Sequence, residues 1–106
     1  MKRQLEQYLS QVSDFDSPRV SLEQYRTPAD IAAHLLILAD LQDDIANRTV
    51  VDLGSGTGML AIGAAFLGPD RVIGLELDRE AVELARANER SIDPPGTIDW
   101  VLGDVR

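Results

Sequence analysis

The sequence contains no cysteine, one histidine and one tryptophan. Without cysteine the chain forms no disulfide and offers no thiolate to a metal ion, and this composition fits a reducing cytoplasm. No apolar run reaches the roughly 20 residues that a membrane-spanning helix needs. The polar start, Met1-Lys2-Arg3-Gln4, does not lead into the apolar segment of a signal peptide. We therefore expect a cytoplasmic protein with no membrane segment and no metal site.

Basic residues are also few. The chain has 10 Lys and Arg against 18 Asp and Glu, which gives a formal net charge of −8. Because phosphate binding needs clustered Lys and Arg, this balance argues against the chain itself forming a nucleic-acid-binding surface. No Ser/His/Asp or metal-ligand cluster can be assembled around His34, the single histidine. With 106 residues, the chain is expected to form at most one small domain.

Two helices are predicted before residue 48. Apolar residues at i, i+3, i+4 and i+7 over 5–12 are typical of an amphipathic helix. The polar stretch over 13–26 is interpreted as a connecting loop. Thr27 is expected to cap a second helix, with Pro28 at its first position and apolar residues over 31–41.

From residue 49 onward, short apolar runs alternate with helical patterns. Strands are predicted over 49–53, 71–77 and 98–102, and helices over 59–67 and 79–92. The order β-α-β-α-β with short links predicts an α/β fold, with a parallel sheet and right-handed crossovers. A doubly wound sheet continues on the other side of its first strand, which would leave an aggregation-prone bare edge here. We therefore expect the chain to be a fragment, truncated after its third strand.

A glycine-rich turn follows the first strand. Gly54, Gly56 and Gly58 come directly after an apolar run that contains Asp52. Glycine permits turn conformations and lets a ligand approach the main chain, while the N–H groups of the following helix favour an anionic group. Strand, glycine turn and helix start together predict a site for a nucleotide-like cofactor.

Two cofactor classes fit this turn. The dinucleotide fingerprint G-x-G-x-x-G/A can be forced onto Gly56-x-Gly58-x-x-Ala61, although the acidic Asp52 would repel a pyrophosphate. Read as a whole, residues 52–58 resemble the D-x-G-x-G-x-G motif of S-adenosylmethionine-dependent methyltransferases. The amine and sulfonium of that cofactor are cationic, so a nearby carboxylate is favourable. Glu76, at the end of the second strand, can accept both ribose hydroxyls in either class.

Residues of the N-terminal half make the resemblance more specific, because they point to one family among these methyltransferases. The run Leu-Glu-Gln-Tyr-Arg-Thr-Pro over 22–28, the run Ile-Ala-Ala over 31–33 and the glycine turn resemble the start of a particular family. These are the small methyltransferases that N6-methylate an adenine in small-subunit ribosomal RNA, with their archaeal relatives. The resemblance covers essentially the whole chain and implies a Rossmann-like class I methyltransferase fold. It also implies that 1–48 contributes helices to the cofactor site, and that 49–106 is the first half of the cofactor-binding α/β domain.

The resemblance further implies a set of cofactor-binding positions. Gln24 and Thr27 would lie over the cofactor, and residues of the glycine turn would line its methionine part. Glu76 would hold the ribose. The last two positions, Asp104 and Val105, would meet the adenine. In chain order these positions are Gln24, Thr27, Asp52, Gly54, Gly56, Thr57, Met59, Glu76, Asp104 and Val105.

The family's catalytic motif, Asn- or Asp-Pro-Pro-Phe/Tyr after the fourth strand, has no counterpart here. The run Asp93-Pro94-Pro95-Gly96 precedes the third strand, lacks the aromatic ring and is interpreted as a turn. No catalytic residue is therefore assigned. The motif orients the adenine amine for in-line methyl transfer, so this chain alone is expected to bind cofactor without methylating RNA.

The sequence thus predicts the cofactor-binding part of an S-adenosylmethionine-dependent rRNA adenine-N6 methyltransferase. The family resemblance implies an RNA substrate for the longer enzyme, and a small zinc-ribbon activator protein that covers an exposed apolar strand. The alternatives are a methyltransferase of another substrate class, a dinucleotide-binding oxidoreductase, and a non-catalytic half-domain that pairs its bare edge with another chain.

Overall fold

The computed structural model describes residues 1–14 and 27–104. Within these residues two helices come first, and three strands then alternate with two further helices, as the sequence predicted. In chain order they are α1 (Lys2–Leu9), α2 (Ala29–Leu41), β1 (Thr49–Leu53), α3 (Met59–Ala64), β2 (Arg71–Glu76), α4 (Arg79–Ile92) and β3 (Ile98–Leu102).

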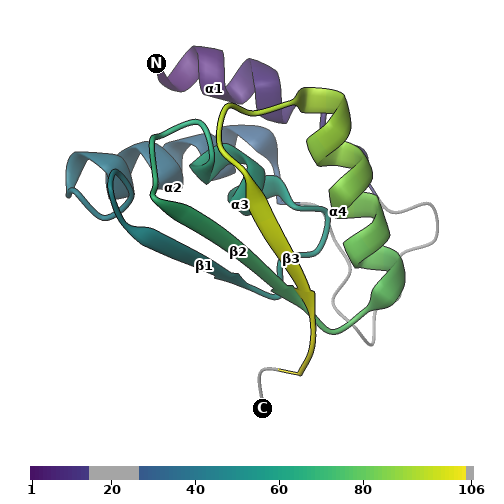
Figure 1. Cartoon of the computed structure of the whole chain (residues 1–106). Helices are drawn as coiled ribbons and strands as arrows, with labels where there is room; N and C mark the ends of the chain where they lie inside the picture. Colours follow the sequence, from purple (N-terminus) through teal and green to yellow (C-terminus); the bar gives the residue numbers. More distant parts are fainter. Residues whose placement is uncertain (15–26, 105–106) are drawn as a thin grey trace.

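The strands form a parallel sheet in the order β1-β2-β3, which confirms the β-α-β-α-β prediction. Figure 1 shows the helices gathered on one side of this sheet. Side chains of successive strand residues point to opposite faces, and on β2 Val72 and Gly74 are buried beneath the helices. On the other face Val51 and Leu53 of β1 are exposed. The core of the described chain therefore lies on one side of the sheet.

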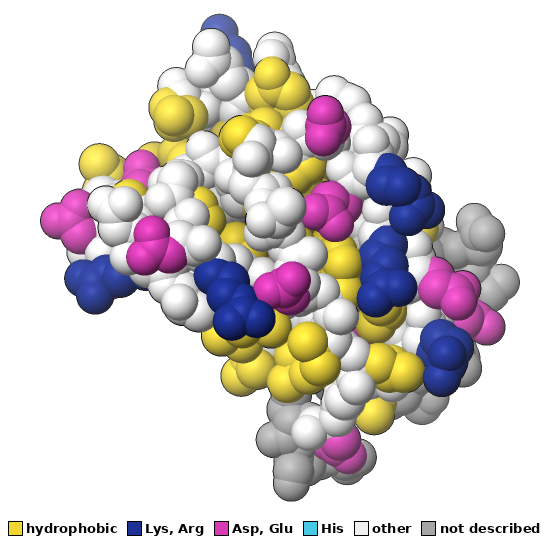
Figure 2. Space-filling model, in the orientation of Figure 1, with side chains coloured by type: hydrophobic (Ala, Val, Ile, Leu, Met, Phe, Trp, Pro, Cys, Tyr) yellow, Lys and Arg dark blue, Asp and Glu magenta, His cyan; other side chains and the backbone are white. Residues whose placement is uncertain are grey.

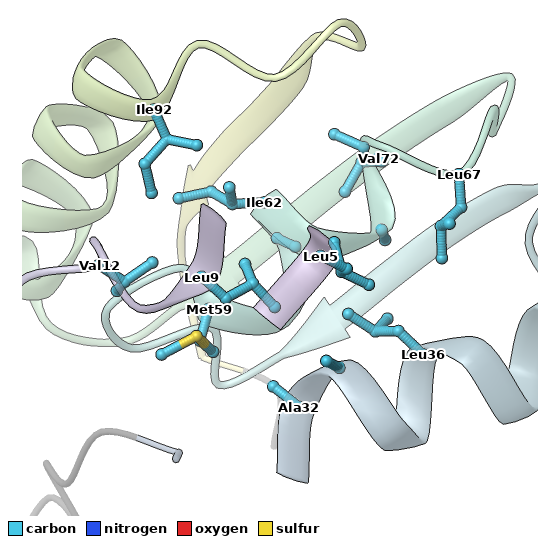
Figure 3. Packing of buried hydrophobic residues seen from close by; sticks show 14 of the residues in the cluster. Leu5, Leu9, Val12, Ala32, Leu36, Met59, Ile62, Leu67, Val72 and Ile92 are labelled. Atoms are coloured by element: carbon cyan, nitrogen blue, oxygen red, sulfur yellow. The ribbon is translucent and has the colours of Figure 1, made fainter. Parts of the chain in front are cut away.

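The core joins the N-terminal helices to the α/β unit. Leu9 of α1 and Ile62 of α3 have no exposed surface and belong to one hydrophobic cluster (Figure 3). Gly63 of α3 lets the helices approach closely, because a Cβ there would overlap the side chain of Leu36 on α2. Helices α1 and α2 thus pack against each other and against α3, which itself contacts β1 and β2.

The second helix begins later than predicted. Thr27 makes no cap: the N-cap of α2 is Pro28, whose ψ of 141° is not helical. Its carbonyl accepts the first helical bond, from the N–H of Ala32 at 2.9 Å. The prediction that Thr27 caps this helix, with Pro28 at the first helical position, is therefore wrong by one residue.

The third helix is shorter than predicted. It ends at Ala64, and the following N–H groups of Phe66 and Leu67 bond three residues back, to the carbonyls of Gly63 and Ala64. Bonds of this spacing tighten the last turn of a helix. Gly68, with φ of 78°, then turns the chain toward β2.

Candidate cofactor-binding site

The glycine turn between β1 and α3 adopts the conformations that its sequence predicted. Gly54, Gly56 and Gly58 have φ of 72°, 55° and 90°, a region that strains other residues. A Cβ at Gly58 would also meet the Trp100 ring at 3.0 Å, whereas one at Gly54 would meet no atom within 4 Å. Backbone conformation thus favours glycine at each position, and close packing favours it again at Gly58.

The turn is tied to the end of β2 by backbone hydrogen bonds. The N–H groups of Gly54 and Ser55 both donate to the carbonyl of Leu75, at 2.8 and 3.1 Å. Within the turn, the N–H of Gly58 donates to the carbonyl of Ser55 at 2.9 Å. These bonds hold the turn directly above the strand end.

Glu76 holds the turn from the other side. Its Oε1 accepts from the N–H of Gly56 at 2.7 Å, and its Oε2 accepts from the N–H of Asp78 at 2.9 Å. Its backbone carbonyl accepts from the N–H of Gly103 at 2.9 Å, which brings the end of β3 alongside. Each carboxylate oxygen has two lone pairs, so both keep acceptor capacity for a further donor.

Asp52 is half-buried, and its carboxyl group lies near that of Glu76. Burial is the main factor that raises its pKa, to about 6 from an ordinary 3.8; the charge of Glu76 raises it further, and a hydrogen bond from the Ala61 backbone opposes both. Its Oδ2 and the Oγ of Ser55 are buried without hydrogen-bond partners among the described residues. The turn therefore has two neighbouring carboxyl groups at its base.

The other predicted site residues are placed as follows. The side chains of Thr57 and Met59 are buried, Met59 within the hydrophobic cluster of Figure 3, so toward a ligand they offer backbone groups. Thr27 is half-buried, and Asp104 follows the end of β3 with an exposed side chain. Gln24 and Val105 lie outside the described residues.

Sequence reasoning missed Asn88 of α4. It is buried, and its Nδ2 donates to the carbonyl of Thr57 in the middle of the turn at 2.9 Å. A signal was present, because Asn88 occupies a position on the apolar face of its helix: Ala81, Ala85 and Ile92 are the buried neighbours at that period. A polar residue at such a position needs hydrogen-bond partners.

The run Asp93-Pro94-Pro95-Gly96 is a turn, as predicted. Asp93 is the C-cap of α4 in the left-handed conformation, with φ of 55°. Its N–H donates to the carbonyl of Glu89 at 2.7 Å. The run serves to end the helix and lead the chain into β3.

No group of three or more potential metal-ligating side chains comes together within residues 1–14 and 27–104. The same residues include no helix long and apolar enough to cross a membrane. Figure 2 shows acidic and basic side chains interspersed over the face it draws, with apolar side chains between them. The visible face therefore does not have the single-sign charge that a nucleic-acid footprint needs.

Comparison with known proteins shows the class of protein to which this chain belongs. Residues 32–93 match a family model described as "Ribosomal protein L11 methyltransferase (PrmA)". The chain belongs to the methyltransferase family that this model describes.

A particular relative matches nearly the whole chain. The chain is 42% identical over 104 residues to the rRNA N(6)-adenosine-methyltransferase Mettl5 of Drosophila melanogaster, covering 97% of this chain and 48% of that protein. The resemblance seen in the sequence is thereby confirmed. The chain spans about half the length of the curated relatives it matches.

Two solved structures confirm the Rossmann-like methyltransferase fold. The crystal structure of PH1948 from Pyrococcus horikoshii superposes with a TM-score of 0.89 at 43% identity, covering 98% of this chain and 51% of that one. An RNA methyltransferase from Salinibacter ruber, in complex with S-adenosyl-L-homocysteine, has a TM-score of 0.63 at 31% identity, covering 76% and 50%.

The raised pKa of Asp52 predicts that the substitution Asp52→Asn stabilises the folded protein by an amount that depends on pH. The folded state holds this proton more tightly than the unfolded chain, so ionisation costs stability as pH rises from 3.8 to about 6. The full cost above that range is about 3 kcal/mol at most. The asparagine amide oxygen can still accept the hydrogen bond from the Ala61 backbone N–H. We therefore expect the unfolding temperature of the variant to exceed that of the wild type by several degrees at pH 8, and this difference to vanish below pH 4. Replacing the exposed Asp70 by asparagine is the control; an equal gain at pH 4 and pH 8 would contradict the assignment.

Proposed function

We propose that this chain is the S-adenosylmethionine-binding part of a methyltransferase that acts on adenine N6 in ribosomal RNA. The observation that carries this proposal is the extent of the similarity. The family model for ribosomal protein L11 methyltransferase leaves out residues 1–31, whereas the match to the Drosophila rRNA enzyme covers 97% of the chain. The N-terminal segment is thus shared with the enzyme that acts on RNA.

The charge of the site supports S-adenosylmethionine over a dinucleotide. Glu76 bonds to the turn itself, and Asp52 lies close enough for its pKa to respond to that charge. Two carboxyl groups at the base of the turn would repel a pyrophosphate and favour a cationic amine and sulfonium. The buried Oδ2 of Asp52, an acceptor without a partner among the described residues, suits a ligand that donates hydrogen bonds. The similar Salinibacter ruber enzyme is in complex with S-adenosyl-L-homocysteine.

The proposed binding roles follow the strand ends. The glycine turn would face the methionine part with the backbone of Thr57 and Met59, and Glu76 would accept from the ribose hydroxyls. Asp104 and the Val105 backbone would meet the adenine. The segment 1–48 would complete the site, with Gln24 and Thr27 lying over the cofactor. The cofactor would supply an electrophilic methyl group, and these residues would orient it.

Cofactor choice is testable by thermal unfolding of the 106-residue chain. We expect S-adenosylhomocysteine to raise the unfolding temperature and NAD to leave it unchanged, because only a bound ligand stabilises the folded state. Glu76→Gln should weaken S-adenosylhomocysteine binding by at least about tenfold, since a bond to a charged group is lost. Glu83→Gln, on an exposed part of α4, is the matched control. Stabilisation by NAD alone would favour the oxidoreductase alternative.

Methyl transfer requires more than the cofactor site. The sequence has no Asn- or Asp-Pro-Pro-Phe/Tyr run, so nothing in it would orient the adenine amine. We expect the 106-residue chain, given small-subunit rRNA and S-adenosylmethionine with a labelled methyl group, to form no N6-methyladenosine. The reading frame continued past Arg106 is assayed in parallel and should form it. Turnover by the short chain, or methylation of a protein instead of RNA by the long one, would contradict this proposal.

We also propose a cytoplasmic zinc-ribbon activator protein as the partner of the longer enzyme. Val101 and Leu102 of β3 are 43% and 44% exposed, and among the described strands β3 pairs only with β2. This outer edge offers both apolar side chains and unpaired backbone groups. A zinc-ribbon protein should copurify with the enzyme from the cytosolic fraction, and Leu102→Asp should abolish this. Copurification that survives the substitution would place the partner elsewhere.

A further inference from the structure

We propose that Asn88 is a positioning residue, which fixes the conformation of the glycine turn at the methionine end of the cofactor. This inference rests on the function proposed above. Three segments meet at its side-chain amide: helix α4, the chain after α1 at Ser13, and the turn at Thr57. The partners Ser13 and Thr57 are distant in sequence both from Asn88 and from each other.

The Asn88 side chain is buried, and both its amide oxygen and its amide nitrogen are hydrogen-bonded. Its Oδ1 accepts from the N–H of Ser13 at 2.9 Å, and its Nδ2 donates to the carbonyls of Ser13 and Thr57 at 3.1 and 2.9 Å. Both Nδ2 hydrogens are therefore used. Turning the amide over would set its oxygen against two carbonyls and its Nδ2 against an N–H. The three partners thus fix the orientation of the amide.

Other side chains cannot repeat this set of bonds. Aspartate has the same shape, but it would place a carboxylate oxygen against the carbonyls of Ser13 and Thr57. Alanine would leave these carbonyls and the Ser13 N–H without partners in a buried place, where unmade hydrogen bonds are costly. The position therefore has a specific chemical requirement as well as a packing requirement.

The bond to Thr57 matters because of where it falls in the turn. The peptide unit that joins Thr57 to Gly58 carries both the carbonyl bound by Asn88 and the N–H that donates to Ser55 at 2.9 Å. Gly56 and Gly58, on either side of Thr57, have φ of 55° and 90°. Glycine moves readily between positive and negative φ, so Gly58, at one end of this peptide unit, makes the unit easier to rotate. Asn88 restrains that rotation.

Two adjacent residues of the turn are held by different side chains. Glu76 binds the N–H of Gly56 at 2.7 Å and is the residue proposed to hold the ribose. Asn88 binds Thr57, whose backbone is proposed to line the methionine part. Loss of Asn88 should therefore weaken recognition of the amino-acid part of the cofactor and spare recognition of the nucleoside.

Two ligands separate these effects. S-Adenosylhomocysteine carries the amino-acid part, and 5′-methylthioadenosine keeps the nucleoside and the sulfur but lacks that part. We expect Asn88→Ala to weaken binding of S-adenosylhomocysteine by about tenfold, the effect of one buried hydrogen bond, and that of 5′-methylthioadenosine by less than about twofold. The dissociation constants are measured by calorimetry on the 106-residue chain.

Ile92→Ala is the control for a merely structural loss. Ile92 is buried on the same helix, in the hydrophobic cluster, and it makes none of the hydrogen bonds of the turn. Its truncation should lower the unfolding temperature without changing the ratio of the two dissociation constants. If Asn88→Ala does not fold, Asn88→Asp is measured instead, because it keeps the shape and the acceptor for Ser13 and replaces the donors by a carboxylate oxygen.

The outcomes distinguish this inference from the proposed function. The positioning role is supported if the dissociation constant of S-adenosylhomocysteine, divided by that of 5′-methylthioadenosine, rises about five- to tenfold for Asn88→Ala or Asn88→Asp. Altered amide resonances of Gly56 and Gly58 should accompany this rise. An unchanged ratio in variants that fold overturns it and leaves cofactor binding intact. If neither Asn88 variant folds where Ile92→Ala does, Asn88 is a folding residue and the positioning role is overturned. A wild-type chain that binds neither ligand overturns the proposed function and this inference together.

Discussion

The site depends on one constraint, which is that a turn with three glycines at positive φ must have its backbone N–H groups paired. Glycine makes the turn possible but gives it no preference among many conformations. The preference comes from outside the turn, from the carbonyl of Leu75 and the carboxylate of Glu76. Strand β2 therefore acts as the template on which the turn after β1 takes its shape. The parallel register, with Leu53 opposite Leu75, brings the two together.

The same arrangement explains why two acidic side chains are kept close. Glu76 accepts backbone bonds that an apolar residue could not accept, and Asp52 accepts one from Ala61 at the start of α3. Their proximity is unfavourable, because burial and the charge of Glu76 raise the pKa of Asp52 to about 6. A carboxyl perturbed in this way, beside a turn that can approach a ligand, is typical of a functional site. A cationic ligand would be attracted to both carboxylates and would offset this repulsion.

Local sequence predicted the parts of the fold that local physics determines. Apolar runs bounded by turns gave the three strands, and the glycines gave the turn, because each pattern has one simple structural solution. The start of α2 was misplaced since Thr27 and Pro28 both suit a helix entry, and the choice depends on a backbone angle at Pro28. Burial of the Met59 side chain was not apparent either, because the short helix α3 is apolar all round and shows no preferred face. Asn88 was missed because its partners are distant in sequence.

The N-terminal segment is coupled to the turn through packing as well as through Asn88. Leu5, Leu9 and Val12 belong to the same hydrophobic cluster as Met59 and Ile62 of α3. Because Gly58 is the N-cap of α3, a displacement of α1 would change the support of the residue that ends the turn. A cofactor site built only from the α/β unit would lack this support. The match to the family model covers residues 32–93, and helix α1, which lies before it, helps to keep the turn in a single conformation.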